Sequence, residues 1–173
     1  VLSKKFIDQN FVRQLAGTEL EQTEGVQKTL QEAVQRSEQK VTLKELFNIA
    51  SNSREAIWNI AQEYGREPKI YLHWSAGHYH SFFSDYHINI DSDGSIYVST
   101  TDFSKILAHT YRRNSGSIGI SLACCYGGIS SDLGNEPPTK EQIESMSRCI
   151  AVVAKALWLT VRINNVMTHG EAA

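Results

Sequence analysis

The stretch between residues 69 and 99 limits most strongly what this chain can fold into. It contains three short runs of alternating polar and apolar residues, at 69–74, 86–91 and 95–99. The turn Asp91-Ser92-Asp93-Gly94 separates the last two runs. Alternation with a period of two is typical of β-strands, and a turn that ends in glycine is typical of a hairpin. We therefore predict three strands here, with the last two forming a hairpin.

Histidines are concentrated in the same stretch. Four of the six histidines of the chain lie there: His73, His78, His80 and His87. His73 stands near the end of the first predicted strand, where α/β proteins commonly bind ligands and metals. Histidine is also the commonest metal ligand near neutral pH. His78 and His80 lie in an aromatic loop, and we expect them to be ordinary loop residues.

The second half of the chain adds a buried strand and a long helix. Residues 117–125, SIGISLACC, are small and apolar, which favours a central strand. Thr139-x-x-Gln142 is a capping box at the start of a helix of about 20 residues. Its apolar stripe consists of Ile143, Met146, Ile150, Val153, Ala154 and Leu157.

A second histidine is expected at a strand end close to the C-terminus. Residues 165–169 are predicted to form a short strand that ends on His169. Two strands that both end in histidine can place these side chains at one edge of a sheet. We therefore expect His73 and His169 to lie within metal-bridging distance, with Tyr86 facing the same place.

Residues 1–66 are predicted to be helical throughout. Thr42-x-x-Glu45 is a capping box, and two short helices are expected, one near 43–50 and one near 56–64. No catalytic constellation is visible there. We therefore divide the chain into a helical N-terminal extension, residues 1–66, and an α/β domain, residues 67–173.

Composition excludes some classes of function. The formal net charge of −2 offers no electrostatic argument for binding nucleic acid. No apolar run approaches the roughly 20 residues that a membrane span needs, and the first ten residues lack the apolar core of a signal peptide. The three cysteines, Cys124, Cys125 and Cys149, suit buried, reduced thiols better than a disulfide framework.

Several motifs occur together in a recognisable order. They are His73-Trp74-Ser75-Ala76-Gly77, the segment 86–97 with Tyr86-His87 and Asp91-x-Asp93-Gly94, His109 followed by 114–120, and Met167-Thr168-His169-Gly170-Glu171. In this order and spacing, the chain from residue 70 onward resembles the type-2 N-acetylmuramoyl-L-alanine amidases. That family includes phage lysozyme-amidases and peptidoglycan recognition proteins.

The resemblance implies a mixed central sheet flanked by helices, a zinc ion, and peptidoglycan as the substrate. The reaction would be hydrolysis of the amide bond between N-acetylmuramic acid and L-alanine. Matched by position, His73 and His169 would be zinc ligands, and the Tyr86 hydroxyl would assist the tetrahedral intermediate. The substrate-binding residues would be His109, Trp74 and Asn114.

Two departures from the family pattern bear on the mechanism. Many members have a glutamate general base at the position of Ser121. The third family ligand, Cys or Asp, lies several residues beyond the second histidine, so we expect it after Ala173 and expect residues 67–173 to be truncated at the C-terminus. An alternative is a non-catalytic peptidoglycan-binding module with an incomplete metal site. A further possibility, compatible with both, is that residues 1–66 dock the chain to a larger assembly.

Overall fold

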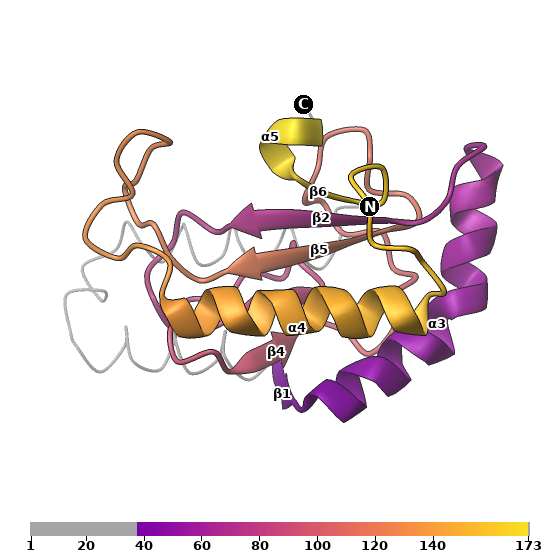
Figure 1. Cartoon of the computed structure of the whole chain (residues 1–173), viewed down its shortest axis with the longest axis horizontal. Helices are drawn as coiled ribbons and strands as arrows, with labels where there is room; N and C mark the ends of the chain where they lie inside the picture. The colour runs from indigo at the N-terminus through magenta and orange to yellow at the C-terminus, as the bar shows by residue number, and fades with distance from the viewer. Residues whose placement is uncertain (1–37, 173) are drawn as a thin grey trace, which may run out of the picture. The chain divides into compact units, whose positions relative to one another are not determined.

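The computed structural model describes residues 38–172 (Figure 1). The helices predicted between residues 1 and 37 lie outside the described residues. From Glu38 onward the chain forms one compact unit. None of the helices in this part of the chain is long and apolar enough to cross a bilayer.

A mixed β-sheet lies at the centre of the described unit. Its six strands are β1 (Gln39–Val41), β2 (Lys69–Trp74), β3 (Ile88–Ile90), β4 (Ile96–Val98), β5 (Ser117–Leu122) and β6 (Val166–Thr168). Their order across the sheet is β1-β4-β3-β5-β2-β6. β5 runs parallel to β2 and β3, and β6 runs parallel to β2. β4 is antiparallel to β1 and to β3, so the predicted hairpin and the predicted mixed sheet are both confirmed.

The two faces of the sheet differ in chemistry, and β5 shows the difference best. All six of its residues are buried, but Ile118, Ile120 and Leu122 alternate with Ser117, Gly119 and Ser121. Successive side chains of a strand point to opposite faces. The isoleucines and the leucine therefore face the hydrophobic core, and the small residues face the other side. On that second side, β2 contributes Lys69, Tyr71 and His73.

Helices cover the apolar face. α3 (Leu43–Glu63) packs against α4 (Lys140–Ala156), and α4 also packs against β3 and β5 (Figure 1). The shared core contains Leu46, Ala50 and Ile57 from α3, Ile70, Ile88, Ile90, Ile118 and Ile120 from the sheet, and Met146, Cys149, Val153 and Leu157 from the region of α4. Burial of this much apolar surface is the main stabilising contribution to such a unit.

The two predicted capping boxes both start helices in the structure. Thr42 and Glu45 cap α3, and Thr139 and Gln142 cap α4. Gln142 has a second role, because its buried side-chain amide donates to the carbonyl oxygens of Ile90 and of Ala123, both at 3.0 Å. The first turn of α4 is therefore attached to the ends of β3 and β5.

The structure corrects the helical prediction for the region before residue 67. Gln39–Val41 forms strand β1 and pairs with β4, so this region is not helical throughout. A single helix, α3, replaces the two short helices. Ser53 does not start a helix, because its hydroxyl donates to the Ile49 carbonyl and accepts from the Phe103 amide. β1 and α3 thus belong to the same compact unit as the rest of the sheet.

Three smaller differences concern element ends and the helix stripe. Ile143 is 51% exposed, because Gln142 rather than Ile143 points inward at the start of α4. Tyr86 and His87 precede β3 instead of forming its first residues. His169 is the first residue of the short helix α5 (His169–Ala172), not the last residue of a strand.

Candidate metal centre

Two histidines from neighbouring strands meet at one edge of the sheet. β2 and β6 are parallel, and Leu72 lies opposite Thr168 in the register. The next residue along each chain is a histidine, so His73 and His169 come side by side. Their Nδ1 atoms are 3.3 Å apart, and their rings meet edge to face with centroids 5.2 Å apart.

A third capping box holds His169 in place. The backbone amide and the hydroxyl of Thr168 both donate to the Glu171 carboxylate, at 2.7 and 2.8 Å. The Glu171 amide donates back to the Thr168 hydroxyl at 3.3 Å. The Thr-x-x-Glu pattern at residues 168–171 is typical of such a box. Residues 165–169 were instead predicted to be a strand that ends on His169. The box makes His169 the first helical residue and directs its exposed side chain towards His73.

A chain of hydrogen bonds runs from His73 into the sheet. His73 Nε2 lies 3.5 Å from the Thr110 hydroxyl, and that hydroxyl lies 3.0 Å from His109 Nδ1. His109 Nε2 is 3.3 Å from the Ser117 hydroxyl. The Ser117 hydroxyl donates to the backbone carbonyl of Asn114 at 2.8 Å. Neither Thr110 nor Ser117 stands out in the sequence, because single hydroxyl residues carry no distinctive spacing.

The last link fixes the direction of the whole chain of hydrogen bonds. A carbonyl oxygen can only accept, so the Ser117 hydroxyl donates to Asn114 and accepts from His109 Nε2. In a neutral imidazole only one ring nitrogen carries a proton, so His109 Nδ1 then accepts from the Thr110 hydroxyl. The Thr110 oxygen in turn accepts from His73 Nε2. With its proton on Nε2, His73 presents the lone pair of Nδ1 to His169.

Electrostatics keep His73 in the neutral form that this arrangement requires. His73 is only 8% exposed. Burial, and to a smaller extent the nearby charge of His169, lower its pKa from 6.5 to about 4. A neutral imidazole with a fixed lone pair is the form of histidine that binds metal ions.

His109 is buried beneath His73. A side chain at Gly119 would place its Cβ 2.7 Å from His109 Cγ, so the glycine leaves the room that the imidazole occupies. The His109 ring also contacts the His73 ring, with centroids 5.3 Å apart. His109 therefore packs against His73 on the side of the sheet. The predicted role of His109 in binding substrate stays a prediction.

Tyr86 is the third aromatic residue next to His73. Their ring centroids are 5.0 Å apart. Burial raises the pKa of the Tyr86 phenol, the negative charge of Asp85 raises it further, and a hydrogen bond with Ser121 opposes both effects. The phenol is therefore protonated at neutral pH and can donate a hydrogen bond.

The other two predicted substrate-binding residues do not join this group. Trp74 alternates with His73 along β2, and its side chain packs against the hydrophobic core. The side-chain oxygen of Asn114 accepts from the Thr110 amide at 2.7 Å. Asn114 thus shapes the turn that carries Thr110. Substrate contacts by either residue remain predictions.

The remaining histidines lie outside the group and have other partners. His78 stacks on Tyr126 and its Nδ1 is 2.9 Å from the Glu136 carboxylate. His80 Nδ1 is 2.7 Å from the Asp91 carboxylate. His87 is fully buried, where its Nδ1 accepts from the Gly119 amide and its Nε2 donates to a carbonyl of the loop before β5.

Comparison with known proteins identifies the family. Residues 20–173 match the family model described as N-acetylmuramoyl-L-alanine amidase. The chain belongs to this amidase family. None of the curated proteins matches this chain.

Two solved structures are similar to this chain. One is the Ph2119 endolysin from the Thermus scotoductus MAT2119 bacteriophage Ph2119, with 20% identity and a TM-score of 0.43 over 63% of this chain and 75% of the endolysin. The other is wild-type Drosophila PGRP-LB, with 20% identity and a TM-score of 0.44 over 60% of this chain and 69% of that chain.

The separation of the paired histidines can be compared with that of two ligands of one metal ion. Two nitrogens that each lie about 2.05 Å from one tetrahedral zinc ion are about 3.3 Å apart. The Nδ1 atoms of His73 and His169 show this separation. Within residues 38–172, no group of three His, Cys, Asp or Glu side chains forms a larger donor set. At this place the described part of the chain thus offers two nitrogen donors.

The three cysteines have the character predicted for them. Cys124, Cys125 and Cys149 are free and buried. Burial raises the pKa of the Cys149 thiol to about 12 and also raises the pKa values of Cys124 and Cys125. Protonated, buried thiols are poor nucleophiles and poor metal ligands.

Proposed function

We propose that this chain is a zinc-dependent amidase that hydrolyses the bond between N-acetylmuramic acid and L-alanine in peptidoglycan. Membership of the amidase family supports the reaction class. The 3.3 Å separation of the Nδ1 atoms of His73 and His169 carries the proposal for zinc. In this proposal both histidines would hold the ion, which would supply a Lewis acid for the scissile carbonyl and for a water molecule.

The protein side of the mechanism rests on three groups. The chain of hydrogen bonds through Thr110 and His109 holds the proton of His73 on Nε2, which keeps Nδ1 available. Tyr86 stays protonated and donates to the oxygen of the tetrahedral intermediate. Ser121 lies opposite His73 in the sheet and bonds to the Tyr86 side chain, so it orients the phenol.

The proposal is tested on purified peptidoglycan by counting newly exposed N-terminal amino groups of L-alanine. We expect release to require zinc, to stop on addition of a chelator, and to resume when zinc is restored. His73→Ala and His169→Ala should each lose bound zinc and activity. His78→Ala is the matched control, because His78 pairs with Glu136 away from the centre.

Two results would overturn the proposal. Release that is insensitive to the chelator would exclude zinc as the cofactor. Binding to peptidoglycan without any release of L-alanine amino groups, in a sample with stoichiometric zinc, would favour the non-catalytic binding module instead.

A further inference from the structure

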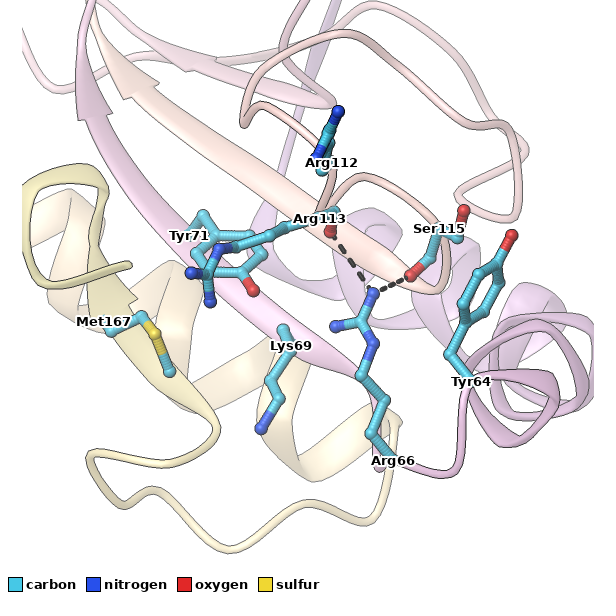
Figure 2. A pocket seen from close by; sticks show the side chains of 8 residues that line it. All are labelled: Tyr64, Arg66, Lys69, Tyr71, Arg112, Arg113, Ser115 and Met167. Carbon is cyan, nitrogen blue, oxygen red and sulfur yellow. Dashed lines mark hydrogen bonds between the residues drawn. The ribbon is translucent and has the colours of Figure 1, made fainter. Parts of the chain in front are cut away.

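Two cavities of the described chain differ in position and chemistry. The first, shown in Figure 2, lies on the polar face of the sheet, where Lys69 and Tyr71 point to the same side as His73. Four of the eight residues that line it are Arg66, Lys69, Arg112 and Arg113, and we call it the positive cavity. Its position makes it part of the surroundings of the candidate metal centre.

The second cavity lies among the helices that cover the apolar face of the sheet, on the other side from the metal centre. Its volume is about 600 Å³. It follows α3 from residue 51 to residue 62, a rise of about 16 Å along the helix axis, so it is long enough for more than one ring-sized group. We call it the tryptophan cavity. Its lining residues are Ser51, Asn52, Arg54, Glu55, Trp58, Asn59, Gln62 and Trp158.

The lining of the tryptophan cavity combines indole rings with uncharged polar groups. The amide side chains of Asn52, Asn59 and Gln62 are exposed and make no hydrogen bond with the described residues. The buried hydroxyl of Ser51 also has no partner there, although buried polar groups are normally satisfied. The two charged lining residues have opposite signs. The cavity therefore suits a ligand that is mostly uncharged and rich in hydrogen-bonding groups.

Two side chains of α3 hold the end of α4 beside this cavity. The indole nitrogen of Trp58 donates to the Leu157 carbonyl at 2.8 Å, and the Arg54 guanidinium donates to the Ala156 carbonyl. Carbonyls in the last turn of a helix have no donor within the helix itself. The Arg54 guanidinium also lies over the Trp158 ring, 3.9 Å from its centroid. Trp158 is therefore held in position although it is 76% exposed.

The backbone at Trp158 shows that stability alone does not favour a tryptophan there. α4 ends in a turn in which the Leu159 amide donates to the Ala154 carbonyl at 2.8 Å and the Trp158 amide donates to the Lys155 carbonyl at 3.3 Å. The residue at the position of Trp158 is left-handed in such a turn, and its φ is 59°. Glycine is favoured at this position because a Cβ is strained there. Backbone strain of this kind is concentrated at functional sites.

A sugar ring matches both kinds of group in the lining. The C–H bonds on one face of a pyranose carry partial positive charge and pack against the negative face of an indole. Hydroxyl and acetamido groups at the edge of the sugar donate and accept hydrogen bonds, as side-chain amides do. An anion would meet a single cation, Arg54, which already donates to Ala156. An apolar helix would meet three amides in place of a continuous apolar surface.

We infer that the tryptophan cavity is a carbohydrate-binding site for the glycan strand of peptidoglycan. Trp158 is its stacking surface, and Asn52, Asn59 and Gln62 are its hydrogen-bonding groups. The choice of this glycan rests on the proposed function, because the glycan carries the peptide whose amide bond would be cleaved. The cavity and the candidate metal centre lie on opposite sides of the sheet, so the cavity holds a glycan without occupying the metal centre.

The test is a binding titration of the whole chain with the linear tetrasaccharide of N-acetylglucosamine. This probe has N-acetylated sugars and no peptide, so an amidase cannot cleave it. Trp158→Gly removes the indole and relieves the left-handed strain, so this variant should fold like the unaltered chain. We expect it to bind the tetrasaccharide about tenfold more weakly. Trp158→Phe keeps an aromatic face and should lose less affinity.

Ile163→Ala is the matched control, because it removes a side chain that is 64% exposed from the same connection between α4 and β6 and does not line the cavity. It should bind the tetrasaccharide like the unaltered chain. The linear tetrasaccharide of glucose, which lacks acetamido groups, tests the role of the amide side chains. We expect it to bind more weakly than the N-acetylated probe.

An unchanged affinity in Trp158→Gly would overturn the inference, because binding elsewhere, such as at the metal centre, survives this substitution. Sedimentation tests a second copy of the chain as the occupant: if Trp158→Gly dissociates a dimer and leaves the sugar affinity unchanged, the cavity is an interface between copies and the inference is wrong.

The inference and the proposed function fail in different ways. Binding that depends on Trp158, in a chain that releases no L-alanine amino groups from peptidoglycan, would count against the proposed function alone. Cleavage of peptidoglycan by a chain that does not bind the tetrasaccharide would count against the carbohydrate-binding site alone.

Discussion

At the scale of single residues, Tyr86 shows how the surroundings select one chemical property. A phenol can act as a base when ionised or as a hydrogen-bond donor when protonated. Burial and the charge of Asp85 raise the pKa of Tyr86, so the donor form prevails. Its ring lies against His73 at the proposed metal centre. The residue is therefore suited to stabilise negative charge that develops on a substrate oxygen.

Tyr86→Phe tests this role directly. The substitution removes the hydroxyl and keeps the ring that packs against His73. We expect kcat for peptidoglycan hydrolysis to fall by roughly 10² to 10³-fold, the usual effect of losing one oxyanion donor, with zinc content unchanged. Turnover equal to that of the unaltered chain would show that Tyr86 serves packing only. His80→Ala, which affects a loop histidine paired with Asp91, is the control.

At the scale of elements, the histidine pair depends on contacts between segments distant in the sequence. β2 carries His73, the loop before β5 carries Thr110 and His109, and β5 carries Ser117. The lone pair of His73 faces its partner because these hydrogen bonds all run in one direction. Groups that orient a metal-binding histidine affect metal affinity strongly even though they do not touch the metal.

Thr110→Val removes the middle link of this chain of hydrogen bonds while keeping the shape of the side chain. We expect zinc affinity, measured by competition with a chromogenic chelator, to fall by about 10- to 100-fold. Thr100→Val is a matched control, because in the loop after β4 the Thr100 hydroxyl bonds only to the backbone of Asp102 among the described residues. An unchanged affinity in Thr110→Val would show that His73 needs no support from this side.

Much of this arrangement could be predicted from the sequence, for identifiable reasons. β2, the hairpin and the capping boxes at Thr42 and Thr139 depend on local patterns, so they were predicted correctly. β1 has three residues, too few to show alternation, and it forms by pairing with β4. α3 continues through Ser53 because that hydroxyl bonds to Ile49 and Phe103, a contact between distant segments.

In the candidate site, too, some residues could be predicted from local patterns and others depend on contacts between distant segments. Strand-end positions and motif order indicated His73, His169 and Tyr86. The orienting role of Thr110 depends on the approach of a loop to β2, which no local pattern records. The Thr168-x-x-Glu171 pattern of a capping box is present in the sequence. It overlaps residues 165–169, whose pattern predicted a strand, so the box was not predicted.

At the scale of the whole molecule, charge is distributed unevenly in ways that the net charge of −2 hides. The positive cavity around Arg113 is one example. Glu38 is another: its carboxylate accepts from Asn89 at 3.2 Å and from Ser99 at 2.8 Å, where β1 joins the sheet. Burial raises its pKa to about 7, and the two hydrogen bonds oppose that rise only partly.

This pKa predicts a dependence of stability on pH. The folded pKa of Glu38 lies above the unfolded value of 4.5, so its contribution to stability is complete below pH 4.5 and is lost as the pH rises through 7. At pH 8 the free energy of unfolding of Glu38→Gln should therefore exceed that of the unaltered chain by on the order of 2 kcal/mol. At pH 4.5 the two free energies should be nearly equal. Denaturant titrations at both pH values measure the difference.

Glu55→Gln, at an exposed position of α3, controls for the loss of one negative charge. A stability gain for Glu38→Gln that is the same at pH 4.5 and at pH 8 would contradict the ionisation argument, because the protonated carboxyl and the amide are similar in charge and size.

The position of β6 at the sheet edge has a consequence for local unfolding. β6 has three residues and, among the strands that the structure describes, pairs with β2 alone, so it can detach while β2 and β5 stay folded. Its amide hydrogens should therefore exchange with solvent faster than those of β5. A ligand that holds His169 against His73 binds only the attached state and should slow this exchange in β6 selectively. Hydrogen–deuterium exchange of residues 166–168 would then measure the free energy of detaching β6 from β2. The difference between the values with and without zinc would give the stabilisation that metal binding adds.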